Sequence, residues 1–416
     1  MTGKIKFFTE DNFKETPIGK TPKDWSVTRL GDVIEVYDSK RIPLSEMERS
    51  KRKGPYPYCG ATGIIDCIDG YIFDGEFVLL VEDGGPFGRF DNKAYTMSGK
   101  FWVNNHVHVL KIIEGKGKNQ FLLFLLNFLN LNPHIVGSTR KKLNQEHMKQ
   151  IVIPLPYLSE QQKIAEVLST VDEAIQKTGE VIAKTERLKK GLMQELLTKG
   201  IGHKEFKDTE IGRIPKEWEA VKLKDVIFEA KSGFACGKRD ENGILQLRMD
   251  NINTEGWINT QAGVKVPILE DINDYLLKPG DILFNNTNSA DLIGKTAIFR
   301  GEFPRCVYSN HITRIRVNPK KTIPEWILYL FIRNWQCGIF KAIRHQHVHQ
   351  AGINQHDLLN LKIPIAHLEE QNRIASTLST VDQKLKLERN EKAKLERIKQ
   401  EMMDLLLTGK IRVKVD

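Results

Sequence analysis

The chain contains two copies of one pattern, and this internal repeat constrains its fold more than any other feature. Residues 13–34 and 206–227 are identical at 12 of 22 positions when they are aligned at a shift of 193. A second pair of segments, 153–172 and 363–382, shares 12 of 20 positions at a shift of 210. A repeat of this density predicts two similar structural units of about 200 residues each.

The stretches between the matched ends differ in both length and sequence. From Trp25 to Pro154 the chain advances 129 residues, and from Trp218 to Pro364 it advances 146. Only short landmarks recur inside, such as an Asn-His pair that ends at His106 in one copy and at His311 in the other. The matching end segments form a common frame, and the sequences between them differ. This pattern indicates two domains that recognise two different targets. The alternative is a duplicated structural domain whose interior has drifted.

Each copy ends in a proline-free segment whose apolar residues alternate at spacings of three and four, which is typical of helices that pair as a coiled coil. A helix of about 40 residues is roughly 60 Å long, and Gly200 and Gly409 follow the two segments as helix ends do. Because the order is domain, helix, domain, helix, we expect an antiparallel pair with one domain at each end. The predicted seam consists of Ile164, Leu168, Val171, Ile175 and Ile182 in the first helix and of Ile374, Leu378, Val381, Leu385, Leu395 and Met402 in the second.

The domains themselves are expected to be mixed α/β with strands predominating, in a pseudo-two-fold internal duplication. This interpretation gives a first domain at 1–156, a first long helix at 157–200, a second domain at 201–366, and a second long helix with the C-terminal tail at 367–416. Runs of β-branched and aromatic residues predict strands at 27–34, 75–81, 101–112, 280–284 and 312–317, and short apolar helices are expected at about 120–131 and 325–333.

Composition restricts the class of protein. Lys and Arg number 63 against 53 Asp and Glu, a formal charge of +10, and a basic surplus favours a polyanionic partner such as nucleic acid. The five cysteines form no CxxC pair, so neither a disulfide framework nor a zinc knuckle is indicated. The longest apolar run, at about 121–131, falls short of the ~20 residues that span a bilayer. We therefore expect a soluble intracellular protein without a membrane partner.

Known catalytic motifs are missing from the sequence. Gly294, Lys295 and Thr296 resemble the end of a P-loop, but Ser289 stands where the first glycine is required. We find no glycine-rich turn for S-adenosylmethionine, no Asn-Pro-Pro-aromatic motif and no paired-carboxylate nuclease constellation. The expectation is a chain with no catalytic residues and no cofactor or metal of its own.

A histidine-rich stretch leaves three interpretations open. His345, His347 and His349 alternate, and together with His311 or His356 they could hold a metal ion. The surrounding segment 344–350 is also basic and rich in glutamine, which suits contact with bases or phosphates at least as well. The third interpretation is a solvated loop.

Taken together, the motifs resemble those of one family. The repeated Pro-x-x-Trp start, the IPLP and IPIA motifs, the EQxxIAxxLSTVD helix start and the LLT helix end are similar to those of type I restriction-modification specificity subunits. The resemblance covers nearly the whole chain. It implies that each variable interval is a target-recognition domain that reads one half of a bipartite double-stranded DNA sequence, and that the long helices set the spacer between the halves.

The resemblance also implies partners and a location. Two copies of an adenine methyltransferase subunit would dock on the helices and bring S-adenosylmethionine, and restriction subunits that use ATP and Mg can join the complex. The location implied is cytoplasmic. A scaffold protein with duplicated protein-binding domains is the main alternative, and it predicts no salt-dependent retention on DNA. A nuclease or methyltransferase in its own right is disfavoured by the missing motifs.

Candidate DNA contacts come from polar and basic clusters in the expected loops, because too few positions match inside the intervals to transfer contacts from a relative. Arginine suits guanine, asparagine and glutamine suit adenine, and lysine more often meets phosphate. The first domain offers Lys40, Arg41, Lys51, Arg52, Lys53, Arg89, Thr139, Arg140, Lys141 and Lys142. The second offers Lys231, Ser232, Lys238, Arg239, Arg248, Asn285, Asn286, Asn288, Arg344, His345, Gln346, His347, His349 and Gln350.

Overall fold

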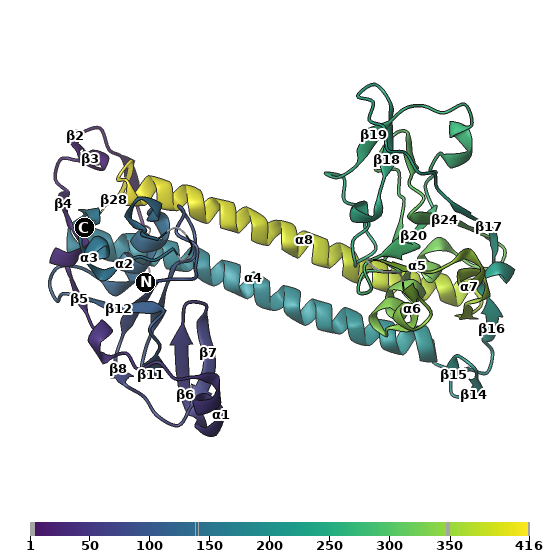
Figure 1. Ribbon diagram of the computed structural model, residues 1–416, viewed down its shortest axis with the longest axis horizontal. Coiled ribbons are helices and arrows are strands. Elements are labelled where there is room, and N and C mark those ends of the chain that lie inside the picture. Colours follow the sequence, from purple (N-terminus) through teal and green to yellow (C-terminus); the bar gives the residue numbers. More distant parts are fainter. Residues whose placement is uncertain (1–4, 138, 140, 347–349, 415–416) are drawn as a thin grey trace. The chain divides into compact units, whose positions relative to one another are not determined.

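The computed structural model describes residues 5–137, 139, 141–346 and 350–414 (Figure 1). Its contacts group the chain into two compact units: unit 1 comprises Met1–Glu180 and Arg389–Asp416, and unit 2 comprises Val181–Glu388. Each unit holds part of both long helices, α4 (Leu158–Lys199) and α8 (Leu368–Leu407). The two long helices expected from the heptad pattern are thus confirmed. The predicted boundaries treat each long helix as a segment of its own, whereas each compact unit contains part of both helices. These boundaries stay a prediction.

Unit 1 is built on two four-stranded sheets. The first has the order β10-β9-β12-β5 and is antiparallel throughout, and the second has the order β7-β6-β11-β8, in which β6 and β11 run parallel. Strand β9 is buried at every residue, and the apolar helix α2 packs on it and on β10. The bounds are β5 (Ile34–Val36), β6 (Lys53–Gly60), β7 (Gly63–Ile68), β8 (Phe73–Asp74), β9 (Phe77–Val81), β10 (Ala94–Met97), β11 (Lys100–Val103), β12 (Val107–Ile112) and α2 (Asn119–Phe128).

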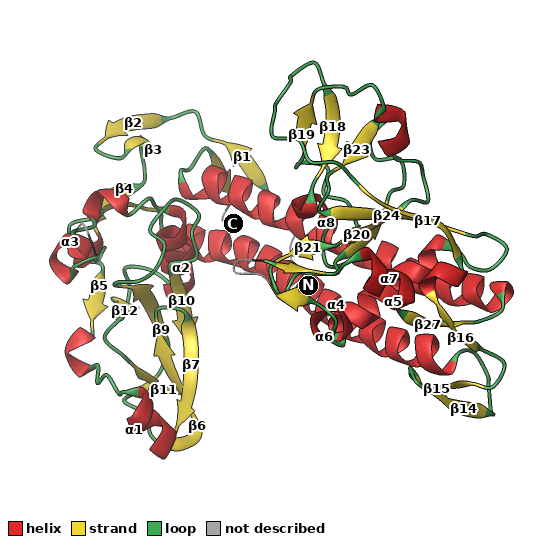
Figure 2. Cartoon of the chain, turned by 45° about the vertical axis from the view of Figure 1, so that its right-hand side comes forward, coloured by secondary structure: helices red, strands yellow, loops and turns green. Residues whose placement is uncertain are grey.

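Unit 2 repeats this topology with different residues (Figure 2). Its first sheet has the order β17-β24-β20-β22, and its second has the order β19-β18-β23, again with one parallel pair, β18 and β23. Helix α5 takes the place of α2 and packs on β22. The mixed α/β fold and its duplication are therefore as predicted. The bounds are β17 (Ile227–Ser232), β18 (Ile244–Leu247), β19 (Val264–Val266), β20 (Ile282–Asn285), β22 (Thr296–Ile298), β23 (Cys306–Tyr308), β24 (Ile312–Val317) and α5 (Pro324–Gln336).

Smaller elements complete the repeated frame. A hairpin, a two-stranded pair and a short helix recur as β2-β3, β4-β13 and α3 in unit 1 and as β14-β15, β16-β27 and α7 in unit 2. In unit 1, β1 and β28 form an antiparallel pair, so a segment near the start of the chain lies beside one near its end. The bounds are β1 (Phe7–Thr9), β2 (Phe13–Thr16), β3 (Gly19–Pro22), β4 (Ser26–Arg29), α1 (Glu46–Lys51), α3 (Gln145–Lys149), β13 (Val152–Leu155), β14 (Phe206–Thr209), β15 (Gly212–Pro215), β16 (Glu219–Lys222), β21 (Thr287–Asn288), α6 (Ile339–Ala342), β25 (His345–Gln346), β26 (Ala351–Gly352), α7 (Gln355–Asn360), β27 (Lys362–Ile365) and β28 (Ile411–Val413).

Within each unit the two helix segments run antiparallel. In unit 1, Lys399 Nζ lies 2.6 Å from an Asp172 carboxylate oxygen, and in unit 2, Lys189 Nζ lies 2.5 Å from an Asp382 carboxylate oxygen. Both aspartates end the repeated LSTVD motif, and both lysines also occupy matching positions of the repeat. The polar residues that interrupt the apolar seam therefore form one ion pair in each unit.

The residues predicted for the seam all lie on the buried or half-buried face of their helices. Other apolar residues, Met193 and Leu197 in unit 2 and Met403 and Leu407 in unit 1, are buried more deeply than Met402. These residues sit near the helix ends, where the helix packs against a domain core as well as against its partner helix. The buried face is wider there than a two-position coiled-coil seam.

Two predicted strands are interrupted. The segment 27–34 holds β4, a 3-10 turn at Leu30–Asp32 and the start of β5, because Leu30 turns into the core. The segment 101–112 holds β11 and β12, which belong to different sheets, and the Asn104 side chain closes the turn between them by accepting from the His106 N–H. Among the described helices, none combines the length and the hydropathy needed to cross a membrane.

Candidate nucleic-acid interface

A loop arm projects from the same position of the first sheet in each unit. Its described residues are 136, 137, 139, 141 and 142 in unit 1 and 344–346 and 350–352, with β25 and β26, in unit 2; we call these the unit 1 arm and the unit 2 arm. The residue that follows the arm donates its N–H to the Glu82 carbonyl in unit 1 and to the Asn286 carbonyl in unit 2. The described residues of two predicted contact clusters, 139–142 and 344–350, therefore lie on equivalent arms.

The structure describes only part of each arm. Thr139, Lys141, His345 and Gln350 are exposed. The His345 ring contacts Asp357 at 2.6 Å, and this hydrogen bond, with a weaker one from His356, lowers the pKa of Asp357. Arg344 is half-buried, and its guanidinium donates to the Lys341 carbonyl. Three predicted residues, Arg140, His347 and His349, and the side chain of Gln346 lie outside the described residues.

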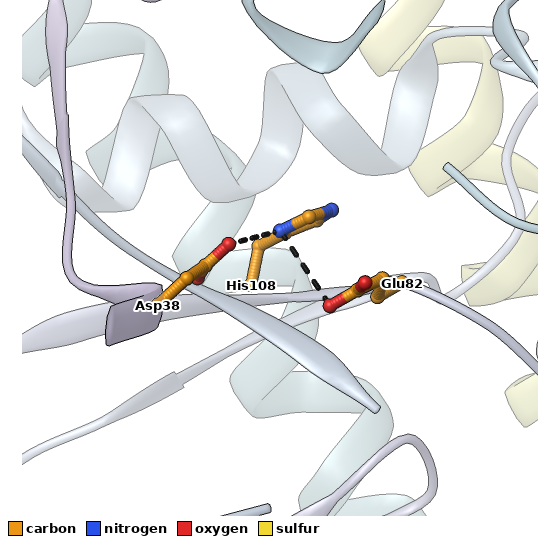
Figure 3. A group of neighbouring side chains, drawn as sticks. All are labelled: Asp38, Glu82 and His108. Atoms are coloured by element: carbon orange, nitrogen blue, oxygen red, sulfur yellow. Dashed lines mark hydrogen bonds and ion pairs between the residues drawn. The ribbon is translucent and has the colours of Figure 1, made fainter. Parts of the chain in front are cut away.

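The unit 1 arm is held by a charged cluster on the first sheet. His108 Nδ1 lies 2.6 Å from Asp38 Oδ2 and 3.9 Å from Glu82 Oε2 (Figure 3), and its Nε2 lies 2.7 Å from the Leu143 carbonyl. Glu82 in turn accepts from Arg41 at 2.5 Å and forms an ion pair with Lys142 of the arm at 2.7 Å. Burial alone would raise the pKa of Glu82, but the hydrogen bonds from Lys142 and Arg41 outweigh it and leave the pKa lowered.

Asp38, Glu82 and His108 are also, within the described ranges, the one set of potential ligand atoms close enough to share a metal ion. The arrangement is closed to such an ion, because both His108 nitrogens already face oxygen partners and two cations occupy the Glu82 carboxylate. The cluster therefore works as a buried ion-pair network that fixes the base of the arm.

Unit 2 has a neutral cluster in the same place. Asn286 matches Glu82, because each donates its backbone N–H to the carbonyl of the repeated histidine, His311 or His106. Its Nδ2 donates to Thr313 Oγ1 at 3.0 Å and lies 3.5 Å from Ser232 Oγ. The two hydroxyls are 3.3 Å apart. Hydroxyl and amide groups thus replace the carboxylates and the imidazole of unit 1 at equivalent positions of one scaffold.

Several predicted contacts in unit 1 are engaged inside the protein. Arg41 belongs to the charged cluster, Arg52 pairs with Asp69 and lies over the Trp102 ring, and Lys53 pairs with Asp66. Arg89 is exposed, but its guanidinium contacts the Asp404 carboxylate on α8. Lys40 and Lys51 are exposed and have no acidic partner in the described structure.

In unit 2 the candidates fall into three groups. Asn285 and Asn288 are buried, and Lys231 pairs with Asp274 at 3.1 Å. Lys238 and Arg239 are exposed in the loop that follows β17. Arg248 is half-buried and lines a hollow of about 540 Å³ together with Gln246, Asn310 and His311, three residues that the sequence did not indicate as DNA contacts. The repeated Asn-His pair was the available signal for the last two.

The frame that carries these sites is fastened in the same way in both units. Trp25 Nε1 donates to Glu160 at 3.0 Å in unit 1, and Trp218 Nε1 donates to Glu370 at 2.9 Å in unit 2. Each contact ties the start of a domain to the start of its own long helix. Both residues of each pair belong to the repeated motifs, which explains why these motifs match so closely while the interiors do not.

Comparison with known proteins gives one consistent result. Residues 22–187 and 215–397 each match the family described as "Type I restriction modification DNA specificity domain". The chain is 32% identical to the "Type I restriction enzyme MjaVIII specificity subunit" of Methanocaldococcus jannaschii, over 99% of this chain and 98% of that protein. It is 24% identical to the "Type I restriction enzyme EcoDI specificity subunit" of Escherichia coli, over 86% and 81%. The fold is similar to the crystal structure of a type I restriction-modification S subunit from M. genitalium, with a TM-score of 0.63 and 13% identity over 92% and 96%.

Proposed function

The chain belongs to the family of type I restriction-modification DNA specificity subunits, and from this premise we propose that units 1 and 2 each read one half of a bipartite DNA target. The observation that carries the proposal is the duplicated topology with different residues at equivalent positions. A common frame holds two domains in one assembly, and different side chains on equivalent arms and sheets give each domain its own sequence. The chain contributes recognition, and catalysis belongs to its partners.

The net charge of +10 supports binding to a polyanion. Arms with exposed polar and basic side chains supply both phosphate contacts and base contacts, whereas the engaged residues of the charged cluster fix the arm in place. The remaining alternative, a scaffold that binds only proteins, gives no reason for two differently filled recognition domains.

The long helices give the proposal its geometry. We propose that the length of the α4–α8 pair sets the spacer between the half-sites, and that its exposed face docks two copies of an adenine methyltransferase subunit. Those subunits would use S-adenosylmethionine, and restriction subunits that use ATP and Mg can join. Because the target is DNA inside the cell, we place the complex in the cytoplasm.

The proposal is tested by expressing the chain with the methyltransferase subunit of its own system and mapping methylated adenines across the genome. We expect one bipartite motif with a fixed spacer when both proteins are present, and no methylation from this chain alone. Exchanging the interval between Trp25 and Pro154 for that of another family member should change one half of the motif only. A change in both halves would contradict the assignment of one domain to each half-site.

A second measurement separates the DNA reader from a protein scaffold. Retention of the complex on DNA should fall steeply between about 50 and 200 mM salt, because each neutralised phosphate releases counterions. Retention that is independent of salt, or absent at low salt, would support the scaffold instead.

A further inference from the structure

The hollow in unit 2 contains buried polar atoms without a partner among the described residues. It is bounded by the loop after β17, by the end of β18 and by the turn between β23 and β24. Gln246 is 0% exposed; its Nε2 donates to the Phe234 carbonyl at 2.9 Å, but its Oε1 accepts from none of the described residues. Buried polar atoms in folded proteins are nearly always paired, with protein groups or with water, so this acceptor marks the hollow as a polar one.

Arg248 lies in the same hollow with spare donors. Its Nη2 donates to the Cys236 carbonyl at 3.2 Å, and its Nε has no partner in the described structure. A guanidinium carries five N–H donors in a planar fork. The backbone beneath it is firmly held, because the Arg248 N–H donates to Asn251 Oδ1 at 2.7 Å. Gln246 Oε1 and Arg248 Nε are both closed to solvent, so the hollow offers the terminal guanidinium donors of Arg248 on a fixed frame.

Arg248 has no counterpart in unit 1, so it is not part of the structure that the two units share. Ser309 N–H donates to the Leu247 carbonyl in unit 2, and Asn104 N–H donates to the Cys59 carbonyl in unit 1. The residue after this carbonyl is Arg248 in unit 2 and Gly60 in unit 1. A Cβ on Gly60 would lie 2.7 Å from Asn104 Nδ2, so a side chain there would require the Asn104 amide to move. Arg248 therefore belongs to what is particular to unit 2.

We propose that Arg248 is a specificity-determining residue that reads a G·C base pair in the half-site bound by unit 2. The major-groove edge of this pair presents the guanine N7 and O6 acceptors beside the cytosine amino donor. Arg248 supplies the donors for the guanine N7 and O6 atoms. Lys238 and Arg239 are exposed just beyond the loop that borders the hollow and are placed to meet the phosphates beside this base pair. This inference rests on the proposed function of unit 2 as a DNA reader.

The test compares Arg248→Met, Arg248→Lys and a control, Arg305→Met, which removes an exposed arginine of the same unit. Each full-length variant is expressed with the methyltransferase subunit on a plasmid library of random sequence, and the methylated motifs are read by sequencing. For Arg248→Met we expect one guanine of one half-site to lose a preference of about tenfold to a hundredfold, with the other half-site unchanged. Arg248→Lys keeps the charge but not the planar fork, so it should relax the same position. The control should retain the wild-type motif.

Three results would overturn the inference: an unchanged motif in both Arg248 variants, relaxation at an A·T pair, or loss of all methylation in both variants, which would make Arg248 a structural residue. The proposed function fails separately. If the wild-type complex produces no bipartite motif, that proposal is wrong whatever the Arg248 variants do.

Discussion

Asp382 and Asp172 occupy matching positions of the repeat, yet removing their charges should have very different effects on stability. The Asp382 side chain is 7% exposed and the Lys189 side chain 11% exposed, and Asp382 also accepts from the buried Tyr329 hydroxyl at 2.9 Å. The Asp172 side chain is 37% exposed and that of its partner Lys399 is 20% exposed. The same substitution, aspartate to asparagine, therefore compares a buried ion pair with a half-exposed one in a single protein.

The expected magnitudes follow from burial. Asp382→Asn keeps an acceptor for Tyr329 but leaves the Lys189 ammonium buried without a counter-charge, which costs about 3–5 kcal/mol. Asp172→Asn leaves Lys399 where water can reach it, and exposed pairs contribute only about 0–1 kcal/mol. For a unit of about 200 residues, 1 kcal/mol shifts the Tm by about 2–4 °C. Asp382→Asn should lower the Tm of unit 2 by at least about 6 °C, and Asp172→Asn should lower that of unit 1 by at most about 4 °C.

Differential scanning calorimetry of the wild type and the two variants measures this difference, and urea unfolding followed by tryptophan fluorescence checks it. Exchange of both partners, Lys189→Met with Asp382→Leu, provides a control, because replacing a buried pair by apolar residues is often neutral or stabilising. Equal Tm shifts for the two aspartate variants, or a neutral Asp382→Asn, would refute the reasoning that burial decides the contribution of each pair.

Three further outcomes are expected. Glu82→Gln should destabilise unit 1 by about 2 kcal/mol in denaturant unfolding at pH 7, because it weakens the charge-assisted hydrogen bonds from Arg41 and Lys142, while Arg41 keeps its ion pair with Asp38. The pKa of Glu82 is lowered in the folded state, so its carboxylate stabilises the protein above about pH 4.3 and loses this effect as pH falls through the folded pKa; the variant should lack this part of the acid sensitivity. Gly409→Ala should lower the Tm more than Gly202→Ala does. Both glycines have a positive φ, but only a Cβ on Gly409 meets other side chains. Equal losses of Tm would show that the backbone strain at positive φ accounts for the whole effect. Residues 173–179 lie opposite residues 392–398 in the register of unit 1. Deleting both heptads should shorten the spacer of the methylated motif by about three base pairs. An unchanged spacer in an active complex would mean that the helices serve only as docking surfaces.

The frame could be predicted from the sequence because the sequence repeats it. Trp25 and Trp218 recur because each indole N–H needs the glutamate that begins the following helix. Similarly, the LSTVD aspartates recur because each pairs with a lysine of the other helix. The topology of the interiors could not be predicted, because few equivalent positions there share side-chain chemistry beyond the repeated Asn-His pair. Glu82 and Asn286 hold the same place through backbone hydrogen bonds, which leave no trace in sequence.

Candidate contacts were harder to identify than the frame for a physical reason. A basic side chain in a loop is equally suited to a phosphate and to an internal carboxylate, and the carboxylate can lie far away in sequence. Arg41 and Lys142 are 101 residues apart, and both bind Glu82. Arg248 lies in a hollow with an unpaired nitrogen, although its sequence neighbourhood is no more basic than theirs. Only the three-dimensional structure separates a cation that is already paired from one that still has donors to offer.

The contrast between the two clusters indicates how such a protein can change its target without losing its fold. The charged cluster lies at the base of the arm in unit 1 and hydroxyl and amide groups take the equivalent place in unit 2, yet the backbone hydrogen bonds around both clusters are the same. A single substitution within the charged cluster leaves a buried charge unpaired and costs several kcal/mol. Exchange of a whole interval carries both partners of every such pair together, since Asp38, Glu82, His108 and Lys142 all lie between Trp25 and Pro154. Replacement of a complete interval is therefore the change that this architecture tolerates best, and point substitution inside a cluster is the one it tolerates least.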